Sequence, residues 1–207
     1  MIDLESNTID LDIFKNVLRE IKNSERTDLI DSLSDNQFKS KLQLLKMIKE
    51  CNILNKDSKV VIIGSWYGSI LIPTIADEVK EITCIDLDDQ VMKIAKNKLF
   101  QKYKNIDYIA ADIFEKDRGR YHTCNLFINT SCEHMKPMNE WPYWKNIKGN
   151  SFFAFQSNDM YQIDTHVNCV ASIKEFKEQL PQNFQILQEH KLEEERGTRF
   201  TLIGKIN

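Results

Sequence analysis

One stretch of the sequence, residues 58–88, constrains the fold more than any other. It begins with an unbroken apolar run at residues 60–63, which is typical of a parallel strand buried on both faces. Gly64 and Gly68 follow and lead into a helical pattern, after which a second strand ends at Asp86. This order of strand, glycine turn, helix, strand and acid predicts the βαβ unit of a doubly wound, mostly parallel α/β sheet.

The same stretch is chemically suited to bind the adenosine part of a cofactor. A glycine turn lets the backbone approach a ligand where any Cβ would collide, and the following helix begins with unpaired N–H groups. A carboxylate placed like Asp86 can accept hydrogen bonds from both ribose hydroxyls. Two glycines alone often serve only to turn a strand into a helix, so the acid at this distance is what favours a ligand site.

The turn resembles motif I of the class I S-adenosylmethionine (SAM) dependent methyltransferases, in which acid-x-Gly-x-Gly-x-Gly is followed by an acid at the end of the second strand. With Gly64 and Gly68 aligned on the outer glycines, Trp66 replaces the middle glycine and Ile62 replaces the acid, so this GSWYG turn is atypical. Trp66 and Tyr67 either stack on the cofactor or substrate or cap the sheet, and we favour the first role. The resemblance implies SAM as the cofactor. The contacts implied for it are Gly64, Ser65, Trp66, Gly68, Asp86, Leu87, Asp112, Ile113 and Asn129.

Two of these contacts follow the third predicted strand. In the methyltransferase pattern, an acid at this place accepts a hydrogen bond from the adenine amino group, and the residue beside it packs on the ring. Asp112 and Ile113 match that pattern by order and spacing. An acid after a strand is otherwise most often a helix cap or a solvated loop residue, and that alternative stays open.

Strands and helices alternate along the rest of the chain. We expect helices at 69–78, 90–101 and 172–180 and strands at 60–63, 81–85, 106–110, 123–128, 151–155, 184–187 and 199–206. The resemblance implies a Rossmann-like, seven-stranded sheet that ends in an antiparallel hairpin. Residues 1–55 have helical periodicity and are expected to form an N-terminal extension, either a lid or, as we favour, a structural cap. Residues 56–207 are then the SAM-binding catalytic domain.

Two groups of polar residues follow the fourth and fifth strands and should meet at one edge of the sheet, beside the cofactor. The first is Asn129, Ser131, Glu133 and His134, and the second is Gln156, Ser157, Asn158, Asp159, His166 and Asn168. Because polar groups are costly to bury unpaired, we expect a site or an exposed loop here rather than core.

Methyl transfer from a sulfonium is a direct displacement, which needs alignment and, for a weak nucleophile, a base. Glu133 and His134 are the expected catalytic groups, with His166 a second base across the cleft, although each histidine taken alone is as often a surface residue. Asn129 is the fourth expected catalytic residue, because it stands where amino-methylating members of the family begin an (Asn/Asp)-Pro-Pro-aromatic motif. The sequence here is Asn-Thr-Ser-Cys, which argues against methylation of nucleobase amines.

A metal site built from Glu133, His134, Asp159, His166 and Cys169 is a further alternative. Their spacing matches no compact ligand motif, so no metal is predicted. The five cysteines are scattered and never form CxxC, which predicts free thiols rather than a disulfide framework.

The charge balance bears on the partner and the location. A net charge of −3 and a pI of about 5.9 give no basic field for nucleic acid, so a small-molecule substrate is favoured.

No apolar run approaches the ~20 residues of a membrane helix, and the acidic start is unlike a signal peptide. We expect a cytoplasmic protein without a membrane partner, and the sequence indicates no oligomeric state.

These observations favour a SAM-dependent methyltransferase that acts on a small molecule or metabolite. One alternative is a SAM-utilising enzyme that does not transfer methyl, such as a lyase, a cyclase or an aminoalkyl transferase. Another is a catalytically silent partner subunit with the same fold.

Overall fold

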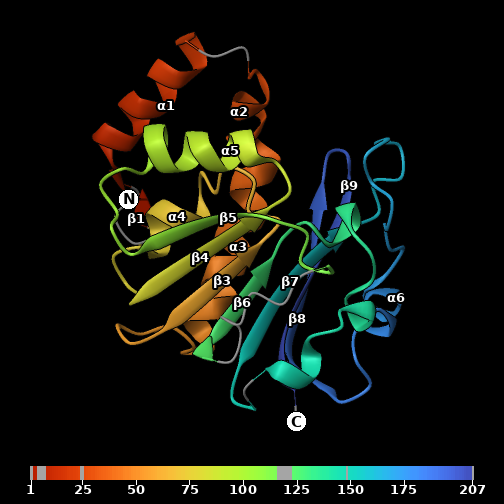
Figure 1. Cartoon of the computed structure of the whole chain (residues 1–207). Helices are drawn as coiled ribbons and strands as arrows, with labels where there is room; N and C mark the ends of the chain where they lie inside the picture. The colour runs from red at the N-terminus through yellow and green to blue at the C-terminus, as the bar shows by residue number, and fades with distance from the viewer. Residues whose placement is uncertain (1, 4–7, 24–25, 116–122, 148, 207) are drawn as a thin grey trace.

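The computed structural model describes residues 2–3, 8–23, 26–115, 123–147 and 149–206. Its centre is a seven-stranded sheet with the order β5-β4-β3-β6-β7-β9-β8 (Figure 1). The strands are β3 Lys59–Ile63, β4 Glu81–Asp86, β5 Ile106–Ala110, β6 Leu126–Asn129, β7 Phe152–Asn158, β8 Phe184–Glu194 and β9 Gly197–Ile206. The first five in spatial order are parallel, and β9 runs antiparallel to both of its neighbours. This confirms the predicted fold class, including the C-terminal antiparallel hairpin.

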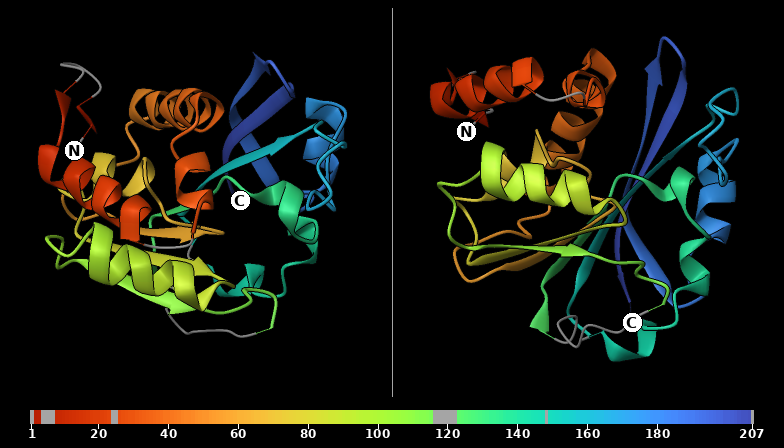
Figure 2. Two further views of the ribbon diagram at one scale, coloured as in Figure 1. Left: turned by 90° about the horizontal axis from the view of Figure 1, so that it is seen from above. Right: turned by 45° about the horizontal axis from the view of Figure 1, so that its top comes forward.

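Helices cover both faces of this sheet (Figures 1 and 2). The α-helices are α1 Leu11–Asn23, α2 Asp28–Asp31, α3 Asp35–Glu50, α4 Leu71–Ile75, α5 Asp89–Ile94 and α6 Ile173–Glu178. A π-helix, η1 Ala95–Leu99, continues α5, and the short 3₁₀ helices are η3 Cys132–His134, η4 Met138–Glu140 and η5 Trp144–Asn146. A two-residue ladder joins β1 Ile2–Asp3 to β2 Thr8–Ile9. Among the described residues, none of these helices combines the length and apolar character needed to span a membrane.

Strand β3 shows why the sheet needs helices on both sides. Its side chains alternate between two hydrophobic clusters, because successive residues of a strand point to opposite faces. Val60 and Ile62 pack in the cluster that includes buried residues of α1, α3, α4 and α5. Val61 and Ile63 pack in the other cluster, with Trp141 and Phe176. The unbroken apolar run therefore reflects burial on both faces, as the sequence predicts.

The N-terminal region is not purely helical, since it also contains the β1–β2 ladder. Helix α3 contributes Leu44 and Ile48 to the same hydrophobic cluster as Val60. Helix α1 lies alongside α5 and η1 (Figure 2), and the side-chain amide of Asn16 donates a hydrogen bond to the Leu99 carbonyl at 3.3 Å. The sheet therefore depends on α3 for part of its core, although α3 falls within residues 1–55.

Strand β7 is longer than predicted, and this corrects one part of the sequence analysis. Gln156, Ser157 and Asn158 belong to the strand and are at most 1% exposed, rather than lying in a loop beside the site. They stay in the ladder because β9 pairs with them, for example Asn158 with Arg199. The Gln156 amide donates to the Ser40 carbonyl at 2.9 Å and to the Thr201 hydroxyl at 3.0 Å, which offsets part of the cost of burying it.

The core beside β7 also contains buried charges. Arg199 on β9 pairs with Glu133 through Nη1 and with Glu194 through Nε, at 3.4 Å in each case. Lys41 on α3 is only 9% exposed, and burial lowers the pKa of its ammonium from the ordinary 10.5 to about 7. Desolvation disfavours the charged form of a lysine, so Lys41 loses its proton far more readily in the folded chain than in the unfolded one.

This buried lysine gives a prediction for stability against pH. Between pH 7 and 10.5 the unfolded chain binds the Lys41 proton more tightly than the folded chain, so the free energy of unfolding should rise with pH. We expect the urea midpoint to increase from pH 7.0 to pH 8.5, and Lys41→Met should remove most of that increase. Lys39→Met is the matched control on the same helix, because the Lys39 side chain is 66% exposed. If the wild type and Lys41→Met change alike with pH, Lys41 keeps an ordinary pKa.

Candidate functional site

The glycine turn lies at the point where the strand order of the sheet reverses. After β3 the chain adds β4 and β5 on one side, and β6 then pairs with the other side of β3. In open α/β sheets, ligands bind outside the carboxyl ends of the strands at such a point. Gly64 follows β3 here, and the Ser131 hydroxyl donates a hydrogen bond to its carbonyl at 3.0 Å. The turn and the segment after β6 are therefore in direct contact.

The backbone of the turn has the left-handed conformation that the glycines predict. Gly64 and Gly68 have φ values of +57° and +66°. A Cβ at Gly64 would lie 2.9 Å from the Ser131 Cβ, and a Cβ at Gly68 would lie 2.4 Å from an Ile72 side-chain atom. Both glycines are thus required by conformation and by space. Ser65, between them, donates its backbone N–H to the Ile85 carbonyl at 3.1 Å.

Trp66 takes the same conformation without being a glycine. Its φ of +47° costs an L-residue about 1–2 kcal/mol. The Asp86 carboxylate offsets this cost, because its Oδ2 accepts the Trp66 backbone N–H at 2.7 Å, and a hydrogen bond to a charged group contributes roughly 1.5–3 kcal/mol. Its Oδ1 accepts the Asp88 backbone N–H at 3.0 Å. Each carboxylate oxygen keeps a second acceptor position, which is compatible with the predicted contact to ribose hydroxyls.

Asp28, at the start of α2, contacts the turn from outside the βαβ unit. Its carboxylate accepts hydrogen bonds from the Trp66 indole N–H and the Tyr67 hydroxyl, both at 3.2 Å. Arg26 forms a two-pronged ion pair with Asp28 at 2.8 and 2.9 Å and also reaches Asp88 at 3.0 Å. The guanidinium lowers the pKa of Asp28 to about 2. The sequence analysis missed this contact, because no local pattern links residue 28 to a turn 38 residues away.

The residues predicted to contact adenine lie in different environments. Leu87 is 73% exposed directly after β4. The Asp112 carboxylate accepts the Phe114 backbone N–H at 2.8 Å. Asp112 therefore stabilises the loop after β5, which agrees with the alternative of a loop residue. Ile113 is 5% exposed, and its carbonyl accepts the Trp141 indole N–H at 3.1 Å. Little of the Ile113 side chain is therefore left for a ligand in this conformation, and the adenine contacts stay predictions.

Asn129, the last residue of β6, is fully buried. Its amide nitrogen lies 3.2 Å from the Met135 sulfur and 3.5 Å from the Met138 sulfur, and its oxygen accepts the Ser131 backbone N–H at 2.9 Å. In this conformation the side chain shapes the turn that follows β6. A direct contact with cofactor or substrate, as predicted, would require that these neighbours move.

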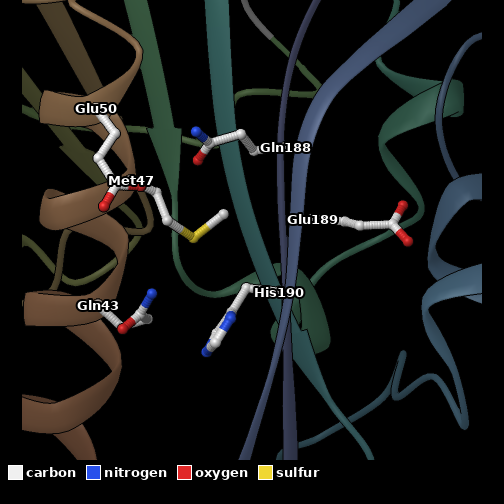
Figure 3. A pocket seen from close by; sticks show the side chains of 6 residues that line it. All are labelled: Gln43, Met47, Glu50, Gln188, Glu189 and His190. Atoms are coloured by element: carbon white, nitrogen blue, oxygen red, sulfur yellow. The ribbon is translucent and has the colours of Figure 1, made fainter.

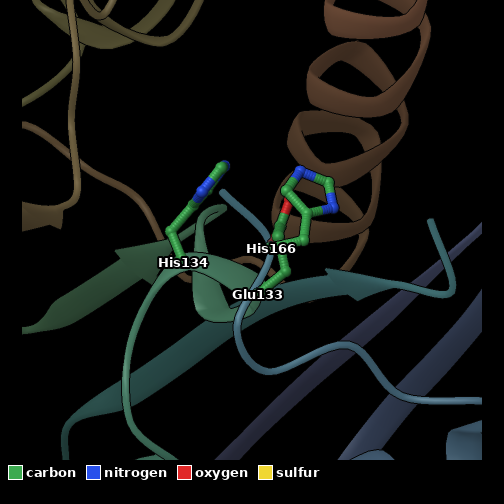
Figure 4. A group of neighbouring side chains, drawn as sticks. All are labelled: Glu133, His134 and His166. Atoms are coloured by element: carbon green, nitrogen blue, oxygen red, sulfur yellow. The ribbon is translucent and has the colours of Figure 1, made fainter. Parts of the chain in front are cut away.

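The structure brings together three of the four expected catalytic side chains, Glu133, His134 and His166 (Figure 4). Glu133 and His134 come from η3, and His166 comes from the loop after β7. One potential ligand atom from each residue lies within 4.8 Å of the others, and the two imidazole rings are 4.6 Å apart and perpendicular. Glu133 is buried, His166 is partly buried and His134 is exposed. The group therefore opens to solvent on the His134 side.

Hydrogen bonds hold the loop after β7 against η3. Asn168 donates its backbone N–H to the Glu133 carbonyl at 2.9 Å and its side-chain amide to the Cys132 carbonyl at 3.3 Å. His134 Nδ1 lies 3.0 Å from the Thr165 carbonyl, which only accepts, so Nδ1 carries the proton and Nε2 has the lone pair. Burial lowers the pKa of His166 and so favours its neutral form.

A separate hollow lies between α3 and β8 (Figure 3). Its lining residues are Gln43, Met47, Glu50, Gln188, Glu189 and His190. None of them belongs to the glycine turn or to the group of Glu133, His134 and His166. The hollow is therefore separate from the residues predicted to form the site.

Comparison with known proteins places these features in context. No protein-family model matches the chain. It is 31% identical over 109 residues to the ribosomal RNA small subunit methyltransferase A of Latilactobacillus sakei subsp. sakei (strain 23K). That match covers 48% of this chain and 36% of the other protein, so the chain spans little more than a third of its curated relative.

Solved structures match over more of the chain. The N-methyltransferase NodS of Bradyrhizobium japonicum WM9, in complex with S-adenosylhomocysteine (SAH), has a TM-score of 0.67 and 14% identity, over 94% of this chain and 98% of that one. TrmK of M. capricolum, also with SAH, has a TM-score of 0.55 and 15% identity, over 80% of this chain and 68% of that one. Both relatives bind the product of SAM, in agreement with the predicted cofactor and enzyme class. The chain thus has the fold of the class I SAM-dependent methyltransferases.

Proposed function

We propose that this chain is a SAM-dependent methyltransferase that acts on a small molecule or metabolite. The observation that carries the proposal is the turn from Gly64 to Gly68, fixed by its hydrogen bond to Asp86 at the point where the strand order reverses. This arrangement offers a close backbone approach and a carboxylate with free acceptor positions, which suits an adenosine ribose. Relatives with the same fold and bound SAH support SAM as that ligand.

The substrate class rests on charge. A net charge of −3 gives the chain no overall attraction for a polyanion, which favours a small acceptor. A ribosomal RNA acceptor is the second candidate, because the curated relative is a ribosomal RNA methyltransferase by name. A salt-dependent affinity for RNA would favour this second candidate over the first.

The roles of the two chain regions and the location are also part of this proposal. Residues 1–55 would be an extension whose α2 covers the turn through Asp28, and residues 56–207 would be the catalytic domain. Glu133, His134 and His166 would lie on the substrate side, since Ser131 in the same segment touches Gly64. The described cysteines are all free thiols, which fits a cytoplasmic protein.

The first test is cofactor binding by calorimetry. We expect SAM and SAH to bind, and Asp86→Asn to weaken binding at least about tenfold, because a hydrogen bond to a charged group contributes roughly 1.5–3 kcal/mol. Asp77→Asn is the matched control: Asp77 is an exposed aspartate in the connection from α4 to β4, at the opposite edge of the sheet. Equal affinity in the wild type and Asp86→Asn would overturn the ribose assignment. A preference for NAD over SAM would instead indicate a dehydrogenase-like site.

The second test uses the fluorescence of Trp66. If its ring lines the ligand site, SAM binding should change the emission of the wild type, and Trp66→Phe should remove most of that change. Trp144 remains in this variant as an internal reference, since it packs against the cluster on the other face of the sheet. An unchanged response in Trp66→Phe would show that the indole serves only to contact Asp28.

A further inference from the structure

We propose that Glu133, His134 and His166 bind one divalent metal ion, of the kind that prefers imidazole and carboxylate ligands, beside the glycine turn. The sequence analysis predicts no metal, because the three residues match no spacing motif. The fold nevertheless brings one potential ligand atom from each to within 4.8 Å of the others. Two histidines and one glutamate form a ligand set that catalytic zinc sites use.

The three ligand atoms need to move only slightly closer together to bind one ion. Three ligand atoms bound tetrahedrally to Zn²⁺ at about 2.1 Å are roughly 3.4 Å apart. The atoms here lie up to 4.8 Å apart, so binding requires some side-chain rotation. His134 is exposed and can rotate without disturbing the core, whereas Glu133 is fixed.

Glu133 provides a second, independent observation. One oxygen, Oε1, accepts hydrogen bonds from the Asn158 amide at 2.6 Å and from Arg199 at 3.4 Å. The other, Oε2, is buried and has no hydrogen-bond partner among the described residues. An unsatisfied buried carboxylate oxygen is unfavourable, and a bound cation would satisfy it. The two hydrogen bonds to Oε1 would at the same time hold the carboxylate in position for the ion.

His134 is oriented in the way that metal-binding histidines usually are. His134 donates from Nδ1 to the Thr165 carbonyl at 3.0 Å, which leaves the Nε2 lone pair for an ion. His166 Nδ1 lies 3.7 Å from the Cys169 sulfur. The ring nitrogen facing away from that contact is then the one available to the metal.

Three protein ligands leave at least one coordination position open, and His134 marks the solvent side. Because the site adjoins the glycine turn through Ser131 and Gly64, we infer an acceptor whose hydroxyl binds the ion; this part rests on the proposed methyltransferase function. The ion would favour loss of the hydroxyl proton to water. The oxygen would then bond to the methyl carbon of SAM, and the electron pair of the broken C–S bond would return to sulfur, giving SAH.

Metal binding is tested on the full chain after treatment with a chelator, without SAM. Zn²⁺ affinity is measured by competition with a chromophoric chelator, and stoichiometry by titration. We expect one ion per chain and a loss of affinity of about 100-fold or more in His134→Ala, since even partners that only orient a ligand contribute 10–100-fold. His134 is exposed, so this variant should fold normally.

His190→Ala is the matched control, because His190 lies on β8 in the separate hollow. The proposal predicts wild-type Zn²⁺ affinity in this variant and a large loss in His166→Ala. Zn²⁺ binding by the wild type no tighter than by His134→Ala would overturn the site, and so would an equal loss in His190→Ala.

The metal site and the proposed function fail in different ways. Zn²⁺ binding that depends on His134, together with no affinity for SAM, would support the metal site and contradict the proposed function. SAM binding by the metal-free chain, together with no Zn²⁺ binding, would contradict the metal site and support the proposed function. A hydroxyl acceptor is supported if methyl transfer by the wild type falls on metal removal and returns when Zn²⁺ is restored, and it is overturned if metal removal leaves the rate unchanged.

Discussion

The hydrogen bond from the Trp66 backbone N–H to Asp86 is the interaction on which the candidate site depends. It joins the turn after β3 to the end of β4, and it holds a bulky residue in a backbone conformation that normally favours glycine. The bond to a carboxylate contributes about as much free energy as the strain costs, so this chain keeps the turn without the middle glycine. In this turn, the hydrogen bond to Asp86 stabilises at Trp66 the backbone conformation that a glycine would adopt without strain.

That contact also explains the place of the N-terminal segment. A tryptophan at this position directs its indole N–H outward, where Asp28 accepts it together with the Tyr67 hydroxyl. Arg26 then ties Asp28 to Asp88, the N-cap of α5. A glycine at position 66 would have no side chain to make this connection. Trp66, which departs from the family pattern, therefore adds a second hydrogen bond to the one by which Tyr67 links α2 to the turn.

Local patterns were sufficient to predict the bounds of three strands of the parallel part of the sheet. Apolar runs predicted β3 and β4 to within one residue, because strands buried on both faces have few other compositions. The bounds of β5 were also predicted as found, although this edge strand is only partly buried. The end of β7 was predicted wrongly because distant partners keep its polar residues in the strand; β9 pairs with them, and Gln156 donates to Ser40, 116 positions away. The Asp28 contact was missed for the same reason. A single sequence shows polar residues but not which long-range partners satisfy them.

Glu133 shows how burial and function can be combined in one residue. Its carboxylate forms a buried ion pair with Arg199 and also lies near two imidazoles at the open edge of the sheet. Arg199 and Asn158, from the neighbouring strands β9 and β7, satisfy only one of its oxygens. A carboxylate that served packing alone would gain from pairing both oxygens, since each buried unsatisfied acceptor costs about 1–3 kcal/mol. Arg199 and Asn158 thus fix Glu133 through one oxygen, and the second, which has no hydrogen-bond partner among the described residues, is the one that the proposed ion would satisfy.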